Sequence, residues 1–193
     1  MKVAAFCGSG RKNGNTALLL NAVLKPLAKA GVETELVELA GSEIRGCMGC
    51  FVCFLEKNGT CVLKKDILND CIAKMAGADA ILLGSPAYFG DVSSEMKALI
   101  DRCGMVSQAN GQMFRRKLGA AVVAVRRSGA VHALDTMNHF FLLGQMILVG
   151  SNSWNVGIGP EKGEVIDDLE GMTTMRILGE NMAWLLDKLT LKT

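Results

Sequence analysis

The sequence has few of the features by which several protein classes are recognised. Its 193 residues include 3 prolines, 2 histidines, 1 tyrosine and only 5% aromatic residues. A formal net charge of +2 is too small for the basic face with which proteins bind nucleic acid, so no such partner is expected. No apolar run approaches the roughly 20 residues of a membrane-spanning helix, which also excludes a membrane role. With 50% hydrophobic residues the chain is too apolar to be disordered.

A signal-peptide core is missing as well, because the apolar residues 3–7 lead directly into the glycine-rich residues 8–10. This pattern predicts a cytoplasmic protein. Its 7 cysteines would then lie in a reducing compartment, which argues against a disulfide framework. Four of them fall within residues 47–61, and such clustered thiols indicate a metal, a cluster or thiol chemistry. The dispersed cysteines are expected to pack as small hydrophobic residues: Cys7, Cys71 and Cys103.

The length predicts one domain that covers residues 1–193. Short apolar strands alternate with amphipathic helices about five times, which predicts a parallel sheet with helices on both faces. Pro26 falls inside the first helical pattern and predicts a kink or an early end there. The predicted strands are residues 2–7, 33–39, 78–84, 118–125 and 146–149, and the predicted helices are residues 17–28, 66–76, 93–103, 132–143 and 169–188.

The loop after the first strand has the composition of a phosphate site. A helix N-terminus follows it, where free N–H groups and the helix dipole favour an anion. The P-loop pattern is absent, and Asn13 stands where the dinucleotide fingerprint requires glycine. A weaker glycine spacing leaves open a nicotinamide dehydrogenase without flavin, with Glu38 on a ribose, or a plain tight turn. The candidate phosphate residues are Ser9, Arg11, Lys12, Asn13, Gly14, Asn15 and Thr16.

A second candidate loop, residues 85–90, follows the most apolar strand. It holds the single tyrosine, Tyr88, next to Phe89. Flat aromatic faces suit a planar heterocycle, although the two rings would also suffice to cover a neighbouring helix. Ligands of parallel sheets bind beyond the carboxyl ends of the strands, so this loop, the phosphate loop and residues 126–130 should converge.

The clustered cysteines follow the pattern Cys47-x2-Cys50-x2-Cys53-x7-Cys61. Two-residue spacers turn the chain so that successive thiolates converge, which suits a cluster with four corners. Structural zinc more often joins two C-x2-C pairs across a longer gap. Zinc and metal-free redox thiols nevertheless remain alternatives.

Five stretches carry a family resemblance: GSGRKNGNT, GCMGCFVCFLEKNGTCVLKKD, ADAILLGSPAYFGDVSSEMKALIDR, RRSGA and DDLEGM. With them the chain resembles the NADPH-dependent FMN reductases of the flavodoxin-like superfamily, and among these the iron–sulfur flavoproteins. Gly10 departs from the proline that is usual in the family. The resemblance implies a three-layer α/β sandwich with a five-stranded parallel sheet. It also implies a cysteine-rich insertion, about residues 46–64, after the second strand.

The resemblance further implies bound FMN, with its phosphate on the first loop and its isoalloxazine ring on the second. It names the four clustered cysteines as ligands of a [4Fe–4S] cluster. A positive charge near the ring would favour reduced flavin, and Arg126 or Arg127 is a candidate. The ring-site candidates are Pro86, Ala87, Tyr88, Phe89, Gly90, Arg127, Ser128 and Gly129.

Two functions from different classes fit these expectations. One is an NAD(P)H-dependent FMN oxidoreductase that passes electrons from NAD(P)H or a ferredoxin to a quinone, another small acceptor or a protein. The other is an electron carrier or redox sensor without a dedicated substrate. Neither needs a catalytic acid, so His132 and His139 are expected on a helix surface. The high apolar content and 11 methionines predict a homodimer or homotetramer.

Overall fold

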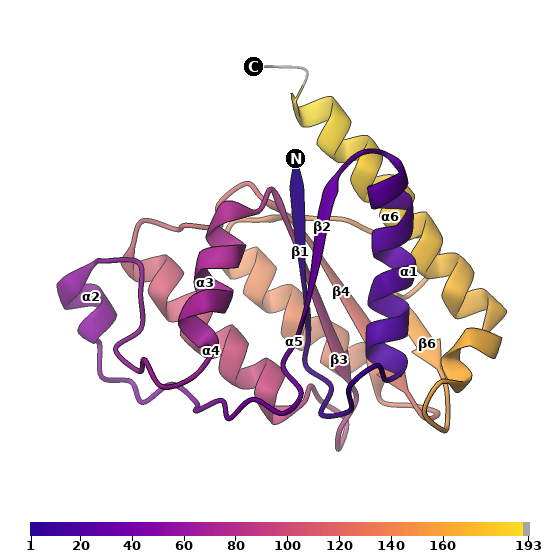
Figure 1. Cartoon of the computed structure of the whole chain (residues 1–193), viewed down its shortest axis with the longest axis horizontal. Coiled ribbons are helices and arrows are strands. Elements are labelled where there is room, and N and C mark those ends of the chain that lie inside the picture. The colour runs from indigo at the N-terminus through magenta and orange to yellow at the C-terminus, as the bar shows by residue number, and fades with distance from the viewer. Residues whose placement is uncertain (191–193) are drawn as a thin grey trace.

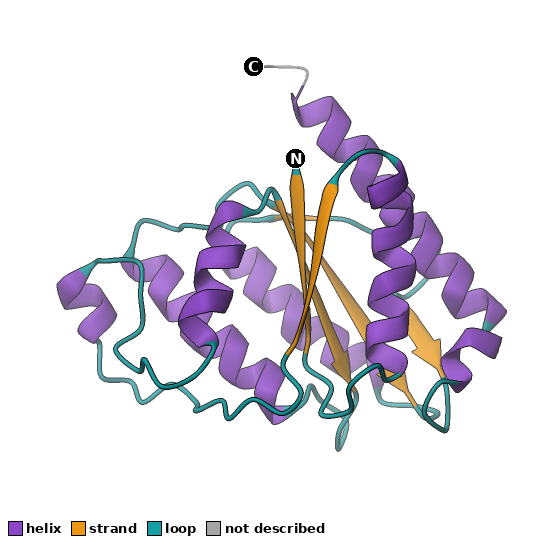
Figure 2. Cartoon of the chain, viewed as in Figure 1, coloured by secondary structure: helices purple, strands orange, loops and turns teal. Residues whose placement is uncertain are grey.

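A computed structural model describes residues 1–190 and shows a parallel sheet between two helix layers (Figures 1 and 2). The strand order is β2-β1-β3-β4-β5, and every pairing is parallel. The elements in chain order are β1 (Lys2–Cys7), α1 (Asn15–Lys29), β2 (Glu33–Glu38), α2 (Val52–Glu56), α3 (Leu68–Gly77), β3 (Ala80–Pro86), α4 (Ser94–Ala109), β4 (Leu118–Val125), α5 (Ala130–Leu143), β5 (Ile147–Leu148), β6 (Val156–Ile158), η1 (Glu164–Asp167) and α6 (Leu169–Thr190).

The two faces of the sheet carry separate cores. Ala4 and Phe6 of β1 pack with α3, α4 and α5, whereas Val3 and Ala5 pack with α1 and α6. Successive strand side chains point to opposite faces, so a strand that is covered on both sides must be apolar throughout. This is why β1, β3 and β4 read as continuous apolar runs in the sequence.

The fifth strand of the sheet differs from its prediction. β5 is only two residues long and pairs with the start of β4, while β6 pairs with the end of the same strand. Two short strands, β5 and β6, thus pair with the same edge of β4 where one strand was predicted. The sheet therefore has six strands instead of five. Sequence reading missed β6 because three residues between polar turns carry no periodic signal.

Pro26 does not end the first helix early, since α1 continues to Lys29. The backbone hydrogen bond that proline removes belongs to the last turn, where its loss disturbs little of the helix. At this point α6 lies very close to α1. A Cβ atom on Gly179 would stand 2.2 Å from the carbonyl oxygen of Val23 and 2.5 Å from Cγ of Pro26. Glycine is therefore required for this approach of the two helices.

The carboxyl ends of the long strands point downward in Figure 1, and the loops that follow them gather there. The cysteine-rich segment leaves β2 at this edge and extends away from the sheet to α2, which packs on α4. In the described part of the chain, no helix has both the length and the apolar character needed to cross a bilayer. The fold therefore places two separate regions near one edge: the loop cluster and the cysteine segment.

Candidate functional site

Hydrogen bonds within the first loop, residues 8–14, define its shape. The buried hydroxyl of Ser9 accepts from the backbone N–H of Arg11 at 3.1 Å. The N–H of Gly14 then donates to the carbonyl of Arg11 at 3.2 Å and closes the turn. The carboxylate of Glu38 accepts from the backbone N–H of Asn13 at 2.9 Å. Glu38, considered above as a ribose ligand, thus holds the loop that leads into α1.

Two buried serines connect this loop to the loop after β3. The hydroxyl of Ser93 donates to the carbonyl of Gly8 at 2.6 Å and accepts from the N–H of Met96 at 3.2 Å, which caps α4. The N–H of Ser93 donates to the hydroxyl of Ser85 at 2.9 Å. The side chain and the backbone N–H of Ser93 together therefore fix the first loop, the third strand and the start of α4 relative to one another.

These loops surround an open cleft of about 210 Å³. It brings together most of the residues that the sequence predicts for the phosphate, but only Pro86, Ala87 and Tyr88 of those predicted for the ring. It also contains a segment that sequence reasoning missed, the turn at residues 159–162, although its Gly-Pro pair is a turn signal. The residues that line the cleft are Ser9, Arg11, Gly14, Asn15, Thr16, Pro86, Ala87, Tyr88, Ala124, Val125, Arg126, Gly159, Pro160 and Lys162.

Asn15 holds the missed turn against the start of α1. Its side-chain amide donates to the carbonyl oxygens of Gly159 and Glu161 at 2.9 and 2.8 Å. Its side-chain oxygen accepts from the N–H of Gly163 at 2.7 Å. The side chain of Asn15 is thus engaged within the protein, and this residue offers a phosphate its position at a helix N-terminus rather than its amide.

Several predicted ring residues lie at the margin of the cleft instead of lining it. The side chain of Phe89 is fully exposed, and its backbone has a φ of +49°. Gly129 has a φ of +88°, and a Cβ atom on it would stand 3.4 Å from Cα of Gly90, so the two loops meet there. Arg127 and Ser128 are exposed in the same turn.

The first arginine of this turn is the one that lines the cleft. The Arg126 guanidinium pairs with the carboxylate of Glu161 at 3.1 Å, and both side chains are largely exposed. Below the turn, His132 lies 3.4 Å from the carboxylate of Asp91 on an exposed face of α5, and His139 is exposed on the same helix. The expected surface position of both histidines is confirmed.

The four clustered cysteines line a second, mainly apolar pocket together. Cys47 and Cys50 are exposed, whereas Cys53 and Cys61 are half-buried. Burial raises the pKa of the Cys53 thiol, and the neighbouring Cys50 and Cys61 add to the rise. The other residues that line the pocket are Met48, Phe51, Val62, Leu63, Arg102, Met105 and Val106.

The sulfur atoms of this pocket are not gathered around one point. Within residues 1–190, no three His, Cys, Asp or Glu side chains form a group that would hold a single metal ion. One zinc ion needs all its sulfur ligands about 2.3 Å away. An iron–sulfur cluster takes each cysteine at a different corner, and four cysteines that line one pocket suit that larger body better.

The remaining cysteines are buried in the two cores, as expected. Burial raises the pKa of Cys7 to about 11 and that of Cys71 to about 12, and it also raises the pKa of Cys103. These thiols stay protonated at neutral pH and are poor nucleophiles and ligands.

A parallel sheet in the order 2-1-3-4-5 defines the flavodoxin-like class. Solved structures agree with this class. RosB with a bound 8-demethyl-8-formylriboflavin-5'-phosphate intermediate aligns with a TM-score of 0.76 at 15% identity, covering 100% of this chain and 81% of RosB. The WrbA-like flavodoxin of Agrobacterium tumefaciens aligns with a TM-score of 0.63 at 14% identity, covering 97% of each chain. At these identities the likeness shows the fold alone.

The sequence is more specific than the fold. The family model for NADPH-dependent FMN reductases matches residues 1–161, and the chain belongs to this family of flavin oxidoreductases. An iron–sulfur flavoprotein of Methanocaldococcus jannaschii is 38% identical over 190 residues, which cover 95% of this chain and 96% of that protein. The predicted fold class and family resemblance are therefore confirmed.

Proposed function

We propose that this protein is an FMN-dependent oxidoreductase that moves electrons from a reduced donor to an acceptor through FMN and a [4Fe–4S] cluster. The observation that carries the proposal is the cleft in which a loop built for an anion meets the loop that holds the single tyrosine. Membership of a flavin reductase family supports the identity of the ligand.

The phosphate of FMN would bind at the start of α1. Ser9 and Thr16 supply hydroxyl groups, and the backbone at Asn13, Gly14 and Asn15 supplies N–H groups near the positive end of the helix dipole. Two cationic side chains, Arg11 and Lys162, line the same cleft and offset the phosphate charge. Lys162 is held there because Asn15 fixes its turn to the helix.

The isoalloxazine ring would lie over Pro86, Ala87 and Tyr88, which line the cleft next to the phosphate loop. Backbone groups of Phe89 and Gly90, together with the turn Arg127, Ser128 and Gly129, border this position. FMN itself supplies hydride and single-electron chemistry, and the protein binds and orients it. Arg126 lies closest to the expected ring among the arginines of its turn, because it lines the cleft.

Cys47, Cys50, Cys53 and Cys61 would hold the cluster. The donor set consists of thiols alone, and all four line one pocket with mostly apolar walls. Such walls limit the access of water to the cluster. A buried arginine nitrogen without a partner also lies at this pocket, and thiolate ligands would satisfy it.

We infer NAD(P)H or a reduced ferredoxin as the donor and a quinone or another small molecule as one acceptor, in a cytoplasmic homodimer or homotetramer. One observation favours the alternative, a carrier that passes electrons to a protein. Apolar side chains are strongly exposed beside the cysteine pocket: Phe51 is 58% exposed and Leu55 is 82% exposed. Exposed apolar groups at a redox centre suit contact with a protein partner.

Anaerobic purification followed by an FMN titration tests the proposal. We expect one FMN per chain, and about four iron and four sulfide per chain with a broad visible absorption. Steady-state oxidation of NADPH with a quinone would then support the enzyme, whereas fast reduction by ferredoxin without such turnover would support the carrier. A protein that binds no FMN would contradict the whole assignment.

A further inference from the structure

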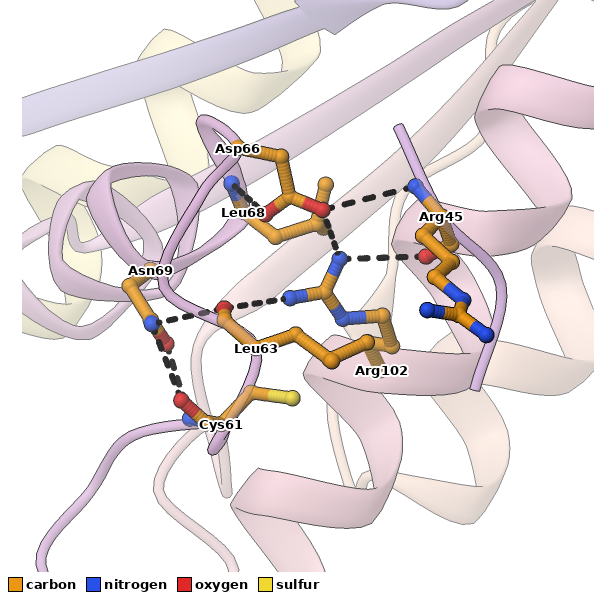
Figure 3. Close-up of polar contacts among 7 residues, drawn as sticks. All are labelled: Arg45, Cys61, Leu63, Asp66, Leu68, Asn69 and Arg102. Atoms are coloured by element: carbon orange, nitrogen blue, oxygen red, sulfur yellow. Dashed lines mark hydrogen bonds and ion pairs between the residues drawn. The ribbon is translucent and has the colours of Figure 1, made fainter. Parts of the chain in front are cut away.

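The cysteine pocket contains a buried cation that sequence patterns do not reveal. Arg102 lies on α4, and its side chain is fully buried (Figure 3). One terminal nitrogen donates to the carbonyl oxygen of Arg45 at 3.0 Å and to the carboxylate of Asp66. The other donates to the carbonyl oxygen of Leu63 at 2.9 Å. Arg102 thereby joins the two ends of the cysteine segment, from which it is 36 to 57 residues distant in the sequence.

The third nitrogen of this guanidinium, Nε, has no hydrogen-bond partner among the residues that the structure describes. Nε of Arg102 is one of three buried side-chain polar atoms within residues 1–190 that have no hydrogen-bond partner, and among them it alone belongs to a residue of the cysteine pocket. An unsatisfied donor in a buried position is costly, and that cost is normally offset by a partner. The missing partner is therefore to be sought in this pocket.

Cys61 is the cysteine next to Arg102. Both side chains line the pocket. Burial lowers the pKa of Arg102, but Asp66 and the nearby Cys61 thiol raise it overall. The backbone of Cys61 is held by Asn69, which accepts from the N–H of Cys61 at 2.7 Å and donates to its carbonyl oxygen at 3.0 Å. The Asn69 contacts fix the main chain of Cys61 and leave its sulfur free to meet the guanidinium.

We propose that Arg102 is a positioning residue for the cysteine-bound cluster: its Nε–H donates to the sulfur of Cys61 and raises the reduction potential of the centre. The proposal rests on the assignment of the four cysteines as cluster ligands. Reduction adds one electron to the centre and increases the negative charge on the ligand sulfur atoms. A hydrogen bond from a cation stabilises this reduced form more than the oxidised form.

Asp66 limits the effect of the cation. Its carboxylate, with a side chain only 8% exposed, pairs with Arg102 and offsets part of the positive charge. Asn at this position has one acceptor oxygen, so it would still accept from the backbone N–H of Leu68, which donates to Oδ1 at 3.2 Å, but would lose that of Arg45, which donates to Oδ2 at 3.4 Å. Changes at Arg102 and Asp66 should therefore move the potential in opposite directions.

An anaerobic potentiometric titration of the cluster-containing protein, followed by electron paramagnetic resonance, tests this. We expect Arg102→Gln to shift the reduction equilibrium toward the oxidised form about tenfold, or about 59 mV for one electron. Arg102→Lys, which keeps the charge but lacks Nε, should shift it less. Asp66→Asn should shift it toward the reduced form.

Arg176→Gln is the matched control, because it removes an arginine charge from an exposed ion pair with Glu180 that does not line the cysteine pocket. It should leave the potential unchanged. If Arg102→Gln does not fold, Arg102→Lys and Asp66→Asn still show whether the potential falls and rises as expected. Wild-type potentials in the Arg102→Lys and Asp66→Asn proteins would overturn the proposal. A wild-type protein without iron and sulfide would instead contradict the cysteine assignment on which it rests.

Discussion

The cleft proposed for FMN and the cysteine pocket lie near one edge of the same sheet but are built in different ways. The cleft is formed by short loops at strand ends, and Ser9, Asn15 and Ser93 fix these loops through hydrogen bonds. The cysteine segment has one five-residue helix, and two of its four cysteines are exposed. The cleft is thus shaped before its ligand arrives, whereas the pocket brings its sulfurs to one place without closing them around a single point.

This difference indicates how much each ligand would contribute to the stability of its own site. FMN would bind in a frame that hydrogen bonds within the protein hold, so its binding should add little to the order of the cleft. A cluster makes four covalent links within one segment and would supply much of the stability of that segment, as bound metals do in small metal-binding domains. The two sites should therefore respond separately to mutation.

The largest expected effect separates the two sites most clearly. Cys53→Ser should lower cluster retention by more than about 100-fold, because even groups one step removed from a metal cost 10–100-fold. FMN affinity should stay within about twofold, since Cys53 does not line the flavin cleft. Iron and sulfide analysis and an FMN titration measure both. Cys71→Ala, in the core, is the control and should keep the cluster. Equal iron content in the wild type and in Cys53→Ser would contradict the assignment of Cys53 as a cluster ligand.

The next effect tests whether the cleft is rigid. A Cβ atom on Gly159 would stand 2.6 Å from Nδ2 of Asn15 and 2.7 Å from the backbone nitrogen of Val165. Gly159→Ala should therefore displace the 159–162 turn at a cost of about 1–3 kcal/mol and weaken FMN binding about 5- to 150-fold. Cluster content should not change.

Gly10→Ala provides the matched control for this prediction. Gly10 belongs to the same cleft region, but within the described residues no atom lies within 4 Å of a Cβ added there. We expect FMN affinity close to that of the wild type. If both glycine variants bind FMN equally well, the turn at residues 159–162 does not belong to the site.

A smaller effect tests the role of Glu38. Removal of its carboxylate in Glu38→Ala leaves the N–H of Asn13 to water and should weaken FMN binding by about 0.5–1.5 kcal/mol, as for an ordinary hydrogen bond. Glu38→Gln retains an acceptor and should lose less. Isothermal titration at low and high salt gives both values. Unchanged affinity in Glu38→Ala would show that the loop keeps its shape without this contact.

The smallest expected effect is on the stability of the protein at acidic pH. Burial alone would raise the pKa of Asp66, but hydrogen bonds from Arg102 and from the Leu68 and Arg45 backbones lower it overall. A lowered folded-state pKa contributes stability that is present above the unfolded value, about 3.9, and is lost as the pH falls below it. The free energy of unfolding of the cluster-free protein should thus fall more steeply below about pH 4 in the wild type than in Asp66→Asn. Parallel curves would contradict this.

Much of the fold could be predicted because local patterns agree with the global arrangement. The apolar runs of β1, β3 and β4 predicted strands that are buried on both faces, and those strands are present. Errors arose where a local signal was misleading. The prediction ended α4 near Gly104, yet the helix continues to Ala109 because that glycine lies against the ring of Phe140. Packing of this kind outweighs the helix penalty of one glycine, about 1 kcal/mol.

The sequence by itself determined the parallel α/β class, the glycine-rich loop after β1 and the four-cysteine spacing, because each depends on residues that are close together in the chain. Only the tertiary structure decided that Asn15 holds a turn 144 residues away and that Arg102 lies buried between segments up to 57 residues distant. An arginine or asparagine looks the same in a sequence whether it faces water or a partner. Its partners depend on how distant segments pack against one another, and the periodicity of nearby residues carries no information about that packing.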